Sequence, residues 1–329
     1  MLAIFGVTFP FFAVVLLGYL AAARGVMPEA AIPGLNTFVL FFALPCMLFR
    51  FGASRPFAQL IDPVLIGIYA SGALLMVLCS IALSLQRHPG GAGVSLKDAA
   101  FGALVATFPN AGFMGVPLLV GMLGERAAGP LIGAILVDLV LTSSLCLALA
   151  QVAPQTPGRH DGGLLRALGR ALRGAASNPL PWAIALGAAL AAFDLALPEP
   201  LAQIVKMLAD AATPVALFTI GAVLWRAGRH STRATPLSGY LPLALVKLLV
   251  HPLLILSLAV IASALGAQVS SFGLLVLVLT AALPSASNVS ILAERYGADN
   301  GRVTRIIMTS TALAFLSFTL IALGLGANL

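Results

Sequence analysis

Long hydrophobic runs, almost free of charge, follow one another along the whole chain and are separated by short polar segments. A helix needs about 20 mostly apolar residues to cross the hydrocarbon core of a bilayer. Ten runs are close to that length: residues 1–23, 30–49, 63–86, 99–124, 127–152, 178–193, 201–225, 239–265, 271–293 and 306–327. The pattern predicts an all-α polytopic membrane protein with ten transmembrane helices and little chain left for a soluble domain.

The composition supports a membrane protein. The chain of 329 residues is 60% hydrophobic and only 9% charged, whereas soluble domains carry about 25% charged residues. Mean hydropathy is +1.06. These values exclude a soluble enzyme, a disordered protein and a nucleic-acid-binding protein. The three cysteines lie inside apolar runs at spacings that fit no metal motif, so we expect buried small side chains and no metal site.

The basic residues between the runs predict the orientation, because cytoplasmic loops are enriched in Lys and Arg. With the N-terminus outside, 13 of the 18 basic residues fall in inner loops, and only Arg50, Arg55 and Arg126 fall in outer loops. We therefore expect both termini on the periplasmic or extracellular side of a bacterial inner membrane. Residues 153–177 then form a basic cytoplasmic linker, whose leucines and arginines at helical spacing could also touch anionic lipid.

The two halves of the chain resemble each other. Residues 43–49 and 212–218 share Ala, Pro, Leu and Phe in register, and residues 106–111 match residues 281–286 at nearly the same offset along the chain. Repeats of five spans, an odd number, must be inverted in the membrane, which is typical of secondary transporters. The prediction is a first five-helix repeat at 1–152 and a second, inverted repeat at 178–329.

Spans four and nine each contain a helix interruption. Residues 109–117 hold two prolines and two glycines, and residues 284–290 hold one proline among small and polar residues. Breaks at equivalent positions of both repeats point to a transport site, because each exposes backbone N–H groups at a half-helix start. We expect a carboxylate to bind there. The candidate substrate-binding residues are Pro109, Asn110, Ala111, Gly112, Pro284, Ser285, Ser287 and Asn288. In the alternative interpretation these prolines only kink two helices.

With these segments the chain resembles the auxin efflux carrier family, which includes plant auxin exporters and bacterial malonate-type permeases. The matching segments are Phe42-Ala43-Leu44-Pro45 with Leu48-Phe49, residues 109–117, Ala212-Thr213-Pro214 through Gly221, and residues 284–288 followed by residues 292–297. The short linker at 153–177 is similar to that of the bacterial members.

The resemblance implies crossed broken helices four and nine, an elevator-like mechanism and a homodimer. It also implies a scaffold of spans 1, 2, 6 and 7 and a transport domain of spans 3–5 and 8–10. The implied substrates are small organic anions, malonate or related mono- and dicarboxylates. By motif position, Asn110 and Asn288 match the crossover asparagines.

Ionisable residues inside spans are candidates for function because their burial is costly. Asp138 lies in span five, and Lys247 and His251 lie four apart in span eight. They could couple transport to a proton or Na⁺ gradient, or Asp138 and Lys247 could form a buried structural ion pair. Lys206 and Asp210, also four apart, are expected to form a local ion pair on the scaffold.

Other functions fit the sequence less well. A sodium–proton antiporter can share the crossed-helix architecture, but such carriers usually need acidic residues at the crossover, where this chain has Asn and Ser. The chain has no HExxH motif, no paired acidic diphosphate-binding motif and no GxSxG motif at a plausible site, as an intramembrane enzyme would need. No segment is long enough for the output domain of a sensor. We therefore expect a secondary carrier of organic anions that is not an enzyme and has no cofactor besides a coupling ion. Its expected partners are the carboxylate substrate, membrane lipid and a second copy of the chain.

Overall fold

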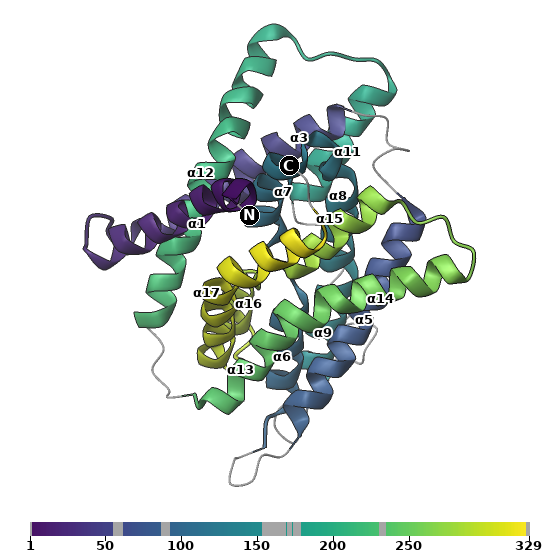
Figure 1. Cartoon of the computed structure of the whole chain (residues 1–329). Helices are drawn as coiled ribbons and strands as arrows, with labels where there is room; N and C mark the ends of the chain where they lie inside the picture. The colour runs from purple at the N-terminus through teal and green to yellow at the C-terminus, as the bar shows by residue number, and fades with distance from the viewer. Residues whose placement is uncertain are drawn as a thin grey trace.

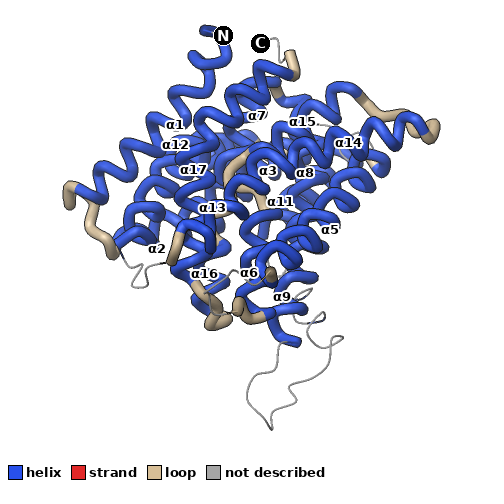
Figure 2. The backbone as a smooth tube through the Cα atoms, turned by 60° about the horizontal axis from the view of Figure 1, so that its bottom comes forward, coloured by secondary structure: helices blue, strands red, loops and turns tan. Residues whose placement is uncertain are grey.

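The computed structural model describes residues 2–54, 62–86, 93–152, 169, 173, 179–229 and 235–326. In this part of the chain every regular element is a helix (Figure 2). The expectation of an all-α protein is confirmed there. Six helical stretches are long and apolar enough to cross a membrane: Ala31–Ala53, Pro63–Leu85, Glu125–Gln151, Glu199–Arg226, Leu237–Ala264 and Asn300–Gly324. Four shorter apolar helices are Phe9–Ala23, Ala111–Leu123, Pro179–Ala192 and Ser271–Ala282.

Several spans combine α-helical and π-helical turns. The first half contains α1 (Leu2–Ala23), α2 (Ala31–Phe38), η1 (Val39–Ala43), α3 (Leu44–Ala53), α5 (Pro63–Leu85), α6 (Leu96–Thr107), η2 (Ala111–Gly115), α7 (Val116–Leu123), η3 (Glu125–Ala127), α8 (Ala128–Val137), η4 (Asp138–Thr142) and α9 (Ser143–Val152). The second half contains α11 (Pro179–Ala192), α12 (Glu199–Arg229), α13 (Leu237–Leu245), η5 (Val246–Val250), α14 (His251–Ala264), α15 (Ser271–Ala282), α16 (Val289–Arg295) and α17 (Asn300–Gly324). Each predicted span corresponds to helix in the described residues.

Two close helix crossings have the same construction. Helix α1 crosses α12 (Figure 1), where a Cβ on Gly18 would overlap the carbonyl oxygen of Phe218 and a Cβ on Gly221 would overlap that of Val15. Small residues let helix backbones approach closely in a membrane.

The second crossing joins α3 to α11. A Cβ on Gly187 would overlap the carbonyl oxygen of Phe49, and one on Gly52 would overlap that of Ile184. Each of these four residues has its counterpart in the first crossing, at the same offset along the chain that relates residues 43–49 to residues 212–218. The two crossings therefore use equivalent positions of the two halves.

The ends of the molecule agree with the predicted alternation of loops. Ser54, Glu125 and Leu197, from three loops expected outside, line one cavity at one end. Near Asp98, Gly239 and Asp299, three segments expected inside meet through hydrogen bonds.

A buried arginine holds this second end together. Arg302 is 6% exposed and donates hydrogen bonds from Nε to Gly239 O (2.7 Å), from Nη1 to Asp98 O (3.3 Å) and from Nη2 to Ser84 Oγ (3.0 Å). The charge pattern placed Arg302 in an inner loop, but it lies in the first turn of α17 and joins α5, α6 and α13. Buried charges need such a complete set of acceptors.

We predict that Arg302→Gln lowers the free energy of unfolding by about 3 kcal/mol, because the shorter amide leaves buried acceptors unpaired. Thermal unfolding in detergent measures the effect. Arg295→Gln, at an exposed position in the last turn of α16, is the matched control and should change the melting temperature little. Equal melting temperatures for the two variants would contradict a structural role for Arg302.

Candidate substrate site at the helix crossover

The two interrupted helices meet through their backbones. Helix α6 ends at Thr107 and η2 begins at Ala111, while α15 ends at Ala282 and α16 begins at Val289. Between these ends Pro109 and Ser285 form an isolated antiparallel bridge. Asn110 N donates to Pro284 O (2.8 Å), and Ala286 N donates to Phe108 O (3.0 Å). The two breaks therefore cross and partly satisfy each other's backbone groups, as a membrane interior requires.

The bridge explains why the chain tolerates prolines at this depth. Proline lacks an N–H donor, but the carbonyl of Pro284 accepts from Asn110. Helix α17 also takes part, since Ser285 N donates to Ser310 Oγ (3.2 Å). The pairing of Pro109 with Ser285 is shifted by one residue from the sequence match, which aligned Pro109 with Pro284.

Several polar groups at the crossover have no partner among the described residues. Thr107 Oγ1, Ser285 Oγ and Asn288 Oδ1 are buried without a hydrogen bond. Four backbone N–H groups next to the breaks, those of Gly112, Phe113, Ser287 and Asn288, likewise have no acceptor in this part of the chain. Buried polar groups are normally paired, so these unpaired groups, all of them donors except the acceptor Asn288 Oδ1, make the crossover the candidate ligand site.

The predicted site residues therefore lie together. All eight come from the two breaks or from the helix starts that follow them, and the Asn110 side chain makes no hydrogen bond with the described residues. Asn110, Ser285 and Ser287 are only 4%, 0% and 6% exposed, so the crossover is shielded from solvent in this conformation. Thr107 and Ser310 were not predicted; Thr107 directly precedes the break, whereas Ser310 lies far from Ser285 along the chain and carries no local signal.

The second predicted group forms a buried polar cluster beside the crossover. Asp138 accepts hydrogen bonds from Tyr69 Oη (2.8 Å) and Thr142 Oγ1 (3.0 Å). Lys247 Nζ donates to Ala281 O (2.8 Å) and lies 3.0 Å from His251 Nδ1. Asp138, Lys247 and His251 are each at most 1% exposed.

Asp138 and Lys247 bind different partners within this cluster. Within the described residues Asp138 and Lys247 form no ion pair within 4.0 Å. Lys247 instead binds a carbonyl in the last turn of α15, three residues before Pro284. His251 Nε2 is buried without a partner. Asp138 and Lys247 lie in the π-helical turns η4 and η5, and such turns often occur at functional sites.

The third predicted pair is confirmed and has an additional member. Lys206 Nζ lies 2.8 Å from Asp210 Oδ2, as expected for residues four apart on a helix. Arg50 Nη1 lies 3.1 Å from Asp210 Oδ1. Arg50 had been assigned to an outer loop, but α3 continues through it to Ala53.

Multiple membrane-spanning helices and crossed breaks with free polar groups define a multi-pass membrane transporter. Residues 3–322 match the model of the family described as "Membrane transport protein", and the chain belongs to this family, that of the auxin efflux carriers. The chain is 30% identical over 321 residues to a protein of Rhizobium meliloti named "Putative malonate transporter". The matched region covers 97% of this chain and 95% of the relative. It is also 29% identical to an "Uncharacterized transporter" of Methanothermobacter thermautotrophicus (93% of each chain) and 24% identical to "Auxin efflux carrier component 8" of Arabidopsis thaliana (88% of each chain).

Proposed function

We propose that this protein is a secondary carrier of small organic anions, malonate or a related mono- or dicarboxylate, and that it binds the carboxylate at the helix crossover. The free donors of Gly112, Phe113, Ser287 and Asn288, next to Asn110, are the observation that carries the proposal. A carboxylate accepts several hydrogen bonds and is stabilised at helix starts. The name of the Rhizobium relative supports malonate as the first substrate to test.

The proposed site has no fixed positive charge at the crossover itself. Its donors are backbone N–H groups, amides and hydroxyls, so an anion gains hydrogen bonds without forming an ion pair that would hold it too firmly for release. The sodium–proton antiporter remains the alternative, but no carboxylate lies within the breaks at residues 108–110 and 283–288. Asp138 instead lies in η4 and is bonded to Tyr69 and Thr142.

We further propose an elevator-like mechanism in which spans 3–5 and 8–10 move against a scaffold of spans 1, 2, 6 and 7. The glycine crossings support the scaffold, because they join span 1 to span 7 and span 2 to span 6 by close backbone contact. Helix α12 of span 7 also packs against α3 of span 2. The hydrogen bonds of Arg302 join segments of spans 3, 4, 8 and 10 at one end, as a body that moves as a unit requires. The common offset between the two crossings supports inverted repeats.

The setting that we propose is a bacterial inner membrane, with both termini outside and the protein acting as a homodimer. The proposed orientation is supported by the excess of Lys and Arg in the loops of one side, which is typical of the cytoplasmic side. Reactivity of a thiol in the loop that contains Leu197 towards a membrane-impermeant reagent, in intact cells, tests the orientation.

Malonate counterflow in proteoliposomes tests the substrate. Counterflow needs no driving ion, so it separates recognition from coupling. Labelled malonate should enter liposomes preloaded with unlabelled malonate, and it should not enter protein-free liposomes. Absence of counterflow for malonate and for a panel of mono- and dicarboxylates would contradict the proposed function.

The polar cluster at Asp138 is proposed to couple transport to an ion gradient. The Tyr69 ring, whose hydroxyl donates to Asp138, lies 5.9 Å from the His251 ring. Lys247 lies next to His251 and binds the end of α15 at the crossover, so a change of charge at Asp138 can alter the geometry of the break. We expect Asp138→Asn to retain malonate counterflow within about threefold and to lose accumulation driven by an imposed proton or Na⁺ gradient. Tyr69→Phe keeps the carboxylate and is the control. If Asp138→Asn accumulates malonate under the gradient as well as the parent does, the cluster has no role in coupling.

A further inference from the structure

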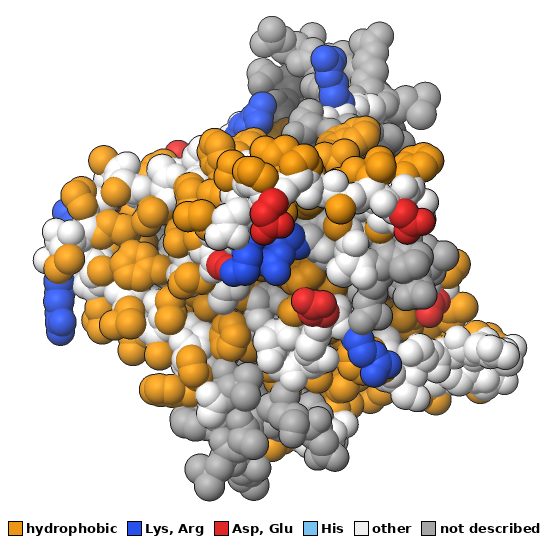
Figure 3. Space-filling model, turned by 90° about the horizontal axis from the view of Figure 1, so that it is seen from above, with side chains coloured by type: hydrophobic (Ala, Val, Ile, Leu, Met, Phe, Trp, Pro, Cys, Tyr) orange, Lys and Arg blue, Asp and Glu red, His pale blue; other side chains and the backbone are white. Residues whose placement is uncertain are grey.

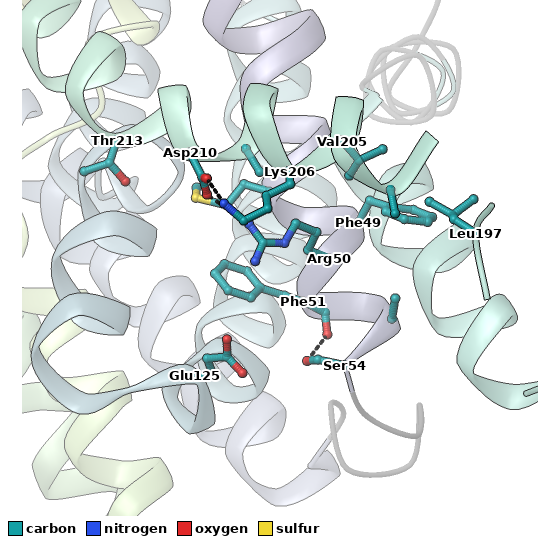
Figure 4. Close-up of a pocket in the computed structure, with 14 residues that line it drawn as sticks. Phe49, Arg50, Phe51, Ser54, Glu125, Leu197, Val205, Lys206, Asp210 and Thr213 are labelled. Atoms are coloured by element: carbon teal, nitrogen blue, oxygen red, sulfur yellow. Dashed lines mark hydrogen bonds and ion pairs between the residues drawn. The ribbon is translucent and has the colours of Figure 1, made fainter. Parts of the chain in front are cut away.

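A second polar site lies at the outer end, in a cavity of about 650 Å³ between α3, η3, the segment before α12, and α12 (Figure 4). This volume is within the usual range of small-molecule sites, about 300–1,000 Å³. Figure 3 shows the face at this end, where basic and acidic side chains gather near the centre among hydrophobic ones.

Two cations in this cavity share one carboxylate. Arg50 and Lys206 both contact Asp210, and the three side chains are 44%, 59% and 53% exposed. Each cation uses one contact on Asp210, whereas a guanidinium has five N–H donors and an ammonium has three. Among the described residues, most of the donors of Arg50 and Lys206 therefore remain available to another anion.

The remaining walls suit the rest of a small organic acid. Met47, Phe49, Phe51, Leu197 and Val205 supply apolar surface around the charged cluster. Mostly apolar walls with a few polar groups that fix orientation are typical of ligand sites. Glu125 also lines the cavity, but it forms no ion pair with either cation in the described residues.

We propose that this cavity is an outer binding site for a carboxylate, in which Arg50 and Lys206 bind the anion. When no anion is bound, both cations form ion pairs with Asp210. The proposal rests on the proposed function, since the anion is the transported one. Helix α12, which carries Lys206 and Asp210, also packs against η2 at the crossover. The site thus borders the helix that leads to the transport site.

The charges of the cluster give variants with opposite expected effects on the KM for external malonate in right-side-out vesicles. The double variant Arg50→Gln with Lys206→Gln should raise this KM about tenfold and keep the maximal rate within twofold of the parent's. The effect on KM is modest because partly exposed charges contribute little to the binding of an anion. Asp210→Asn should lower the KM about threefold by freeing both cations. Glu125→Gln, the matched control, removes a carboxylate from the same cavity without touching the cations and should change the KM less than twofold.

A second readout does not depend on malonate transport. Ser54→Cys, in a background with Cys46→Ala and Cys79→Ala, places a thiol at the rim of the cavity one turn after Arg50. The ratio of its reaction rates with an anionic and a cationic methanethiosulfonate reagent measures the electrostatic potential at the cavity. The anionic-to-cationic ratio should fall about fivefold in Arg50→Gln with Lys206→Gln and rise in Asp210→Asn. Arg126→Gln, outside the cavity lining, should leave it unchanged.

An unchanged KM and an unchanged rate ratio would overturn the proposal and leave the cluster as a structural link between α3 and α12. Absence of malonate transport by the parent would instead contradict the proposed function. In that case the rate ratio alone decides whether the cavity concentrates anions, so the two failures are distinguishable.

Discussion

Replacement of both crossover asparagines, Asn110→Ala with Asn288→Ala, is expected to reduce malonate counterflow about 100-fold or more. Each amide group offers hydrogen-bond donors to the carboxylate, and a hydrogen bond to a charged group contributes about 1.5–3 kcal/mol. The two side chains stand next to the backbone N–H groups that have no acceptor among the described residues. Initial rates at several malonate concentrations in proteoliposomes measure the loss.

The control for this prediction is Asn36→Ala. Asn36 lies on α2, outside the crossover, and is partly buried like Asn288. Its replacement removes the same chemical group and should leave counterflow within about twofold of the parent. Counterflow at the parental rate in the double variant, with correctly inserted protein, would show that the anion binds elsewhere.

Gly221→Ala is expected to be among the most damaging single-methyl changes in the protein. A Cβ at this position would overlap the carbonyl oxygen of Val15 and crowd the N–H of Tyr19. Both obstacles are backbone atoms, so α1 and α12 must separate. Overpacking of this kind costs about 3 kcal/mol, which corresponds to a melting temperature about 10 °C lower in detergent. Gly52→Ala should show a loss of similar size, because it meets Ile184 and Ala188 at the equivalent positions of the other crossing.

Gly67→Ala supplies the comparison. Gly67 is in the second turn of α5, and a Cβ there would meet no atom within 4 Å. The added methyl group should leave the melting temperature unchanged or slightly raised, since Ala favours helix more than Gly. Equal losses for Gly67→Ala and Gly221→Ala would mean that helix propensity, and not the crossing, determines the effect.

The sequence predicts the helices well because two strong signals coincide. Apolar runs of bilayer length predict the spans, and clustered Pro, Gly, Ser and Asn predict the interruptions after Thr107 and Ala282. The ends of helices are less predictable, because helix continues through polar turns. Helix α3 continues through Arg50, and α12 continues to Arg229.

The partners of buried groups could not be predicted, because they depend on contacts between distant segments. Tyr69 is far from Asp138 along the chain, and its hydroxyl hydrogen bond to the carboxylate leaves no mark in either segment. The one-residue shift in the bridge between Pro109 and Ser285 is likewise a tertiary feature. A count of loop charges cannot distinguish a solvated arginine from Arg302, which is buried and donates hydrogen bonds to three acceptors.

A structure of the parent protein determined with malonate by electron cryo-microscopy tests the central claim most directly. The account predicts density for the anion between the two breaks, within hydrogen-bond distance of the Asn110 or Asn288 side chain and of the free backbone N–H groups. An unoccupied crossover in a preparation that exchanges malonate, with the anion bound elsewhere, would contradict it.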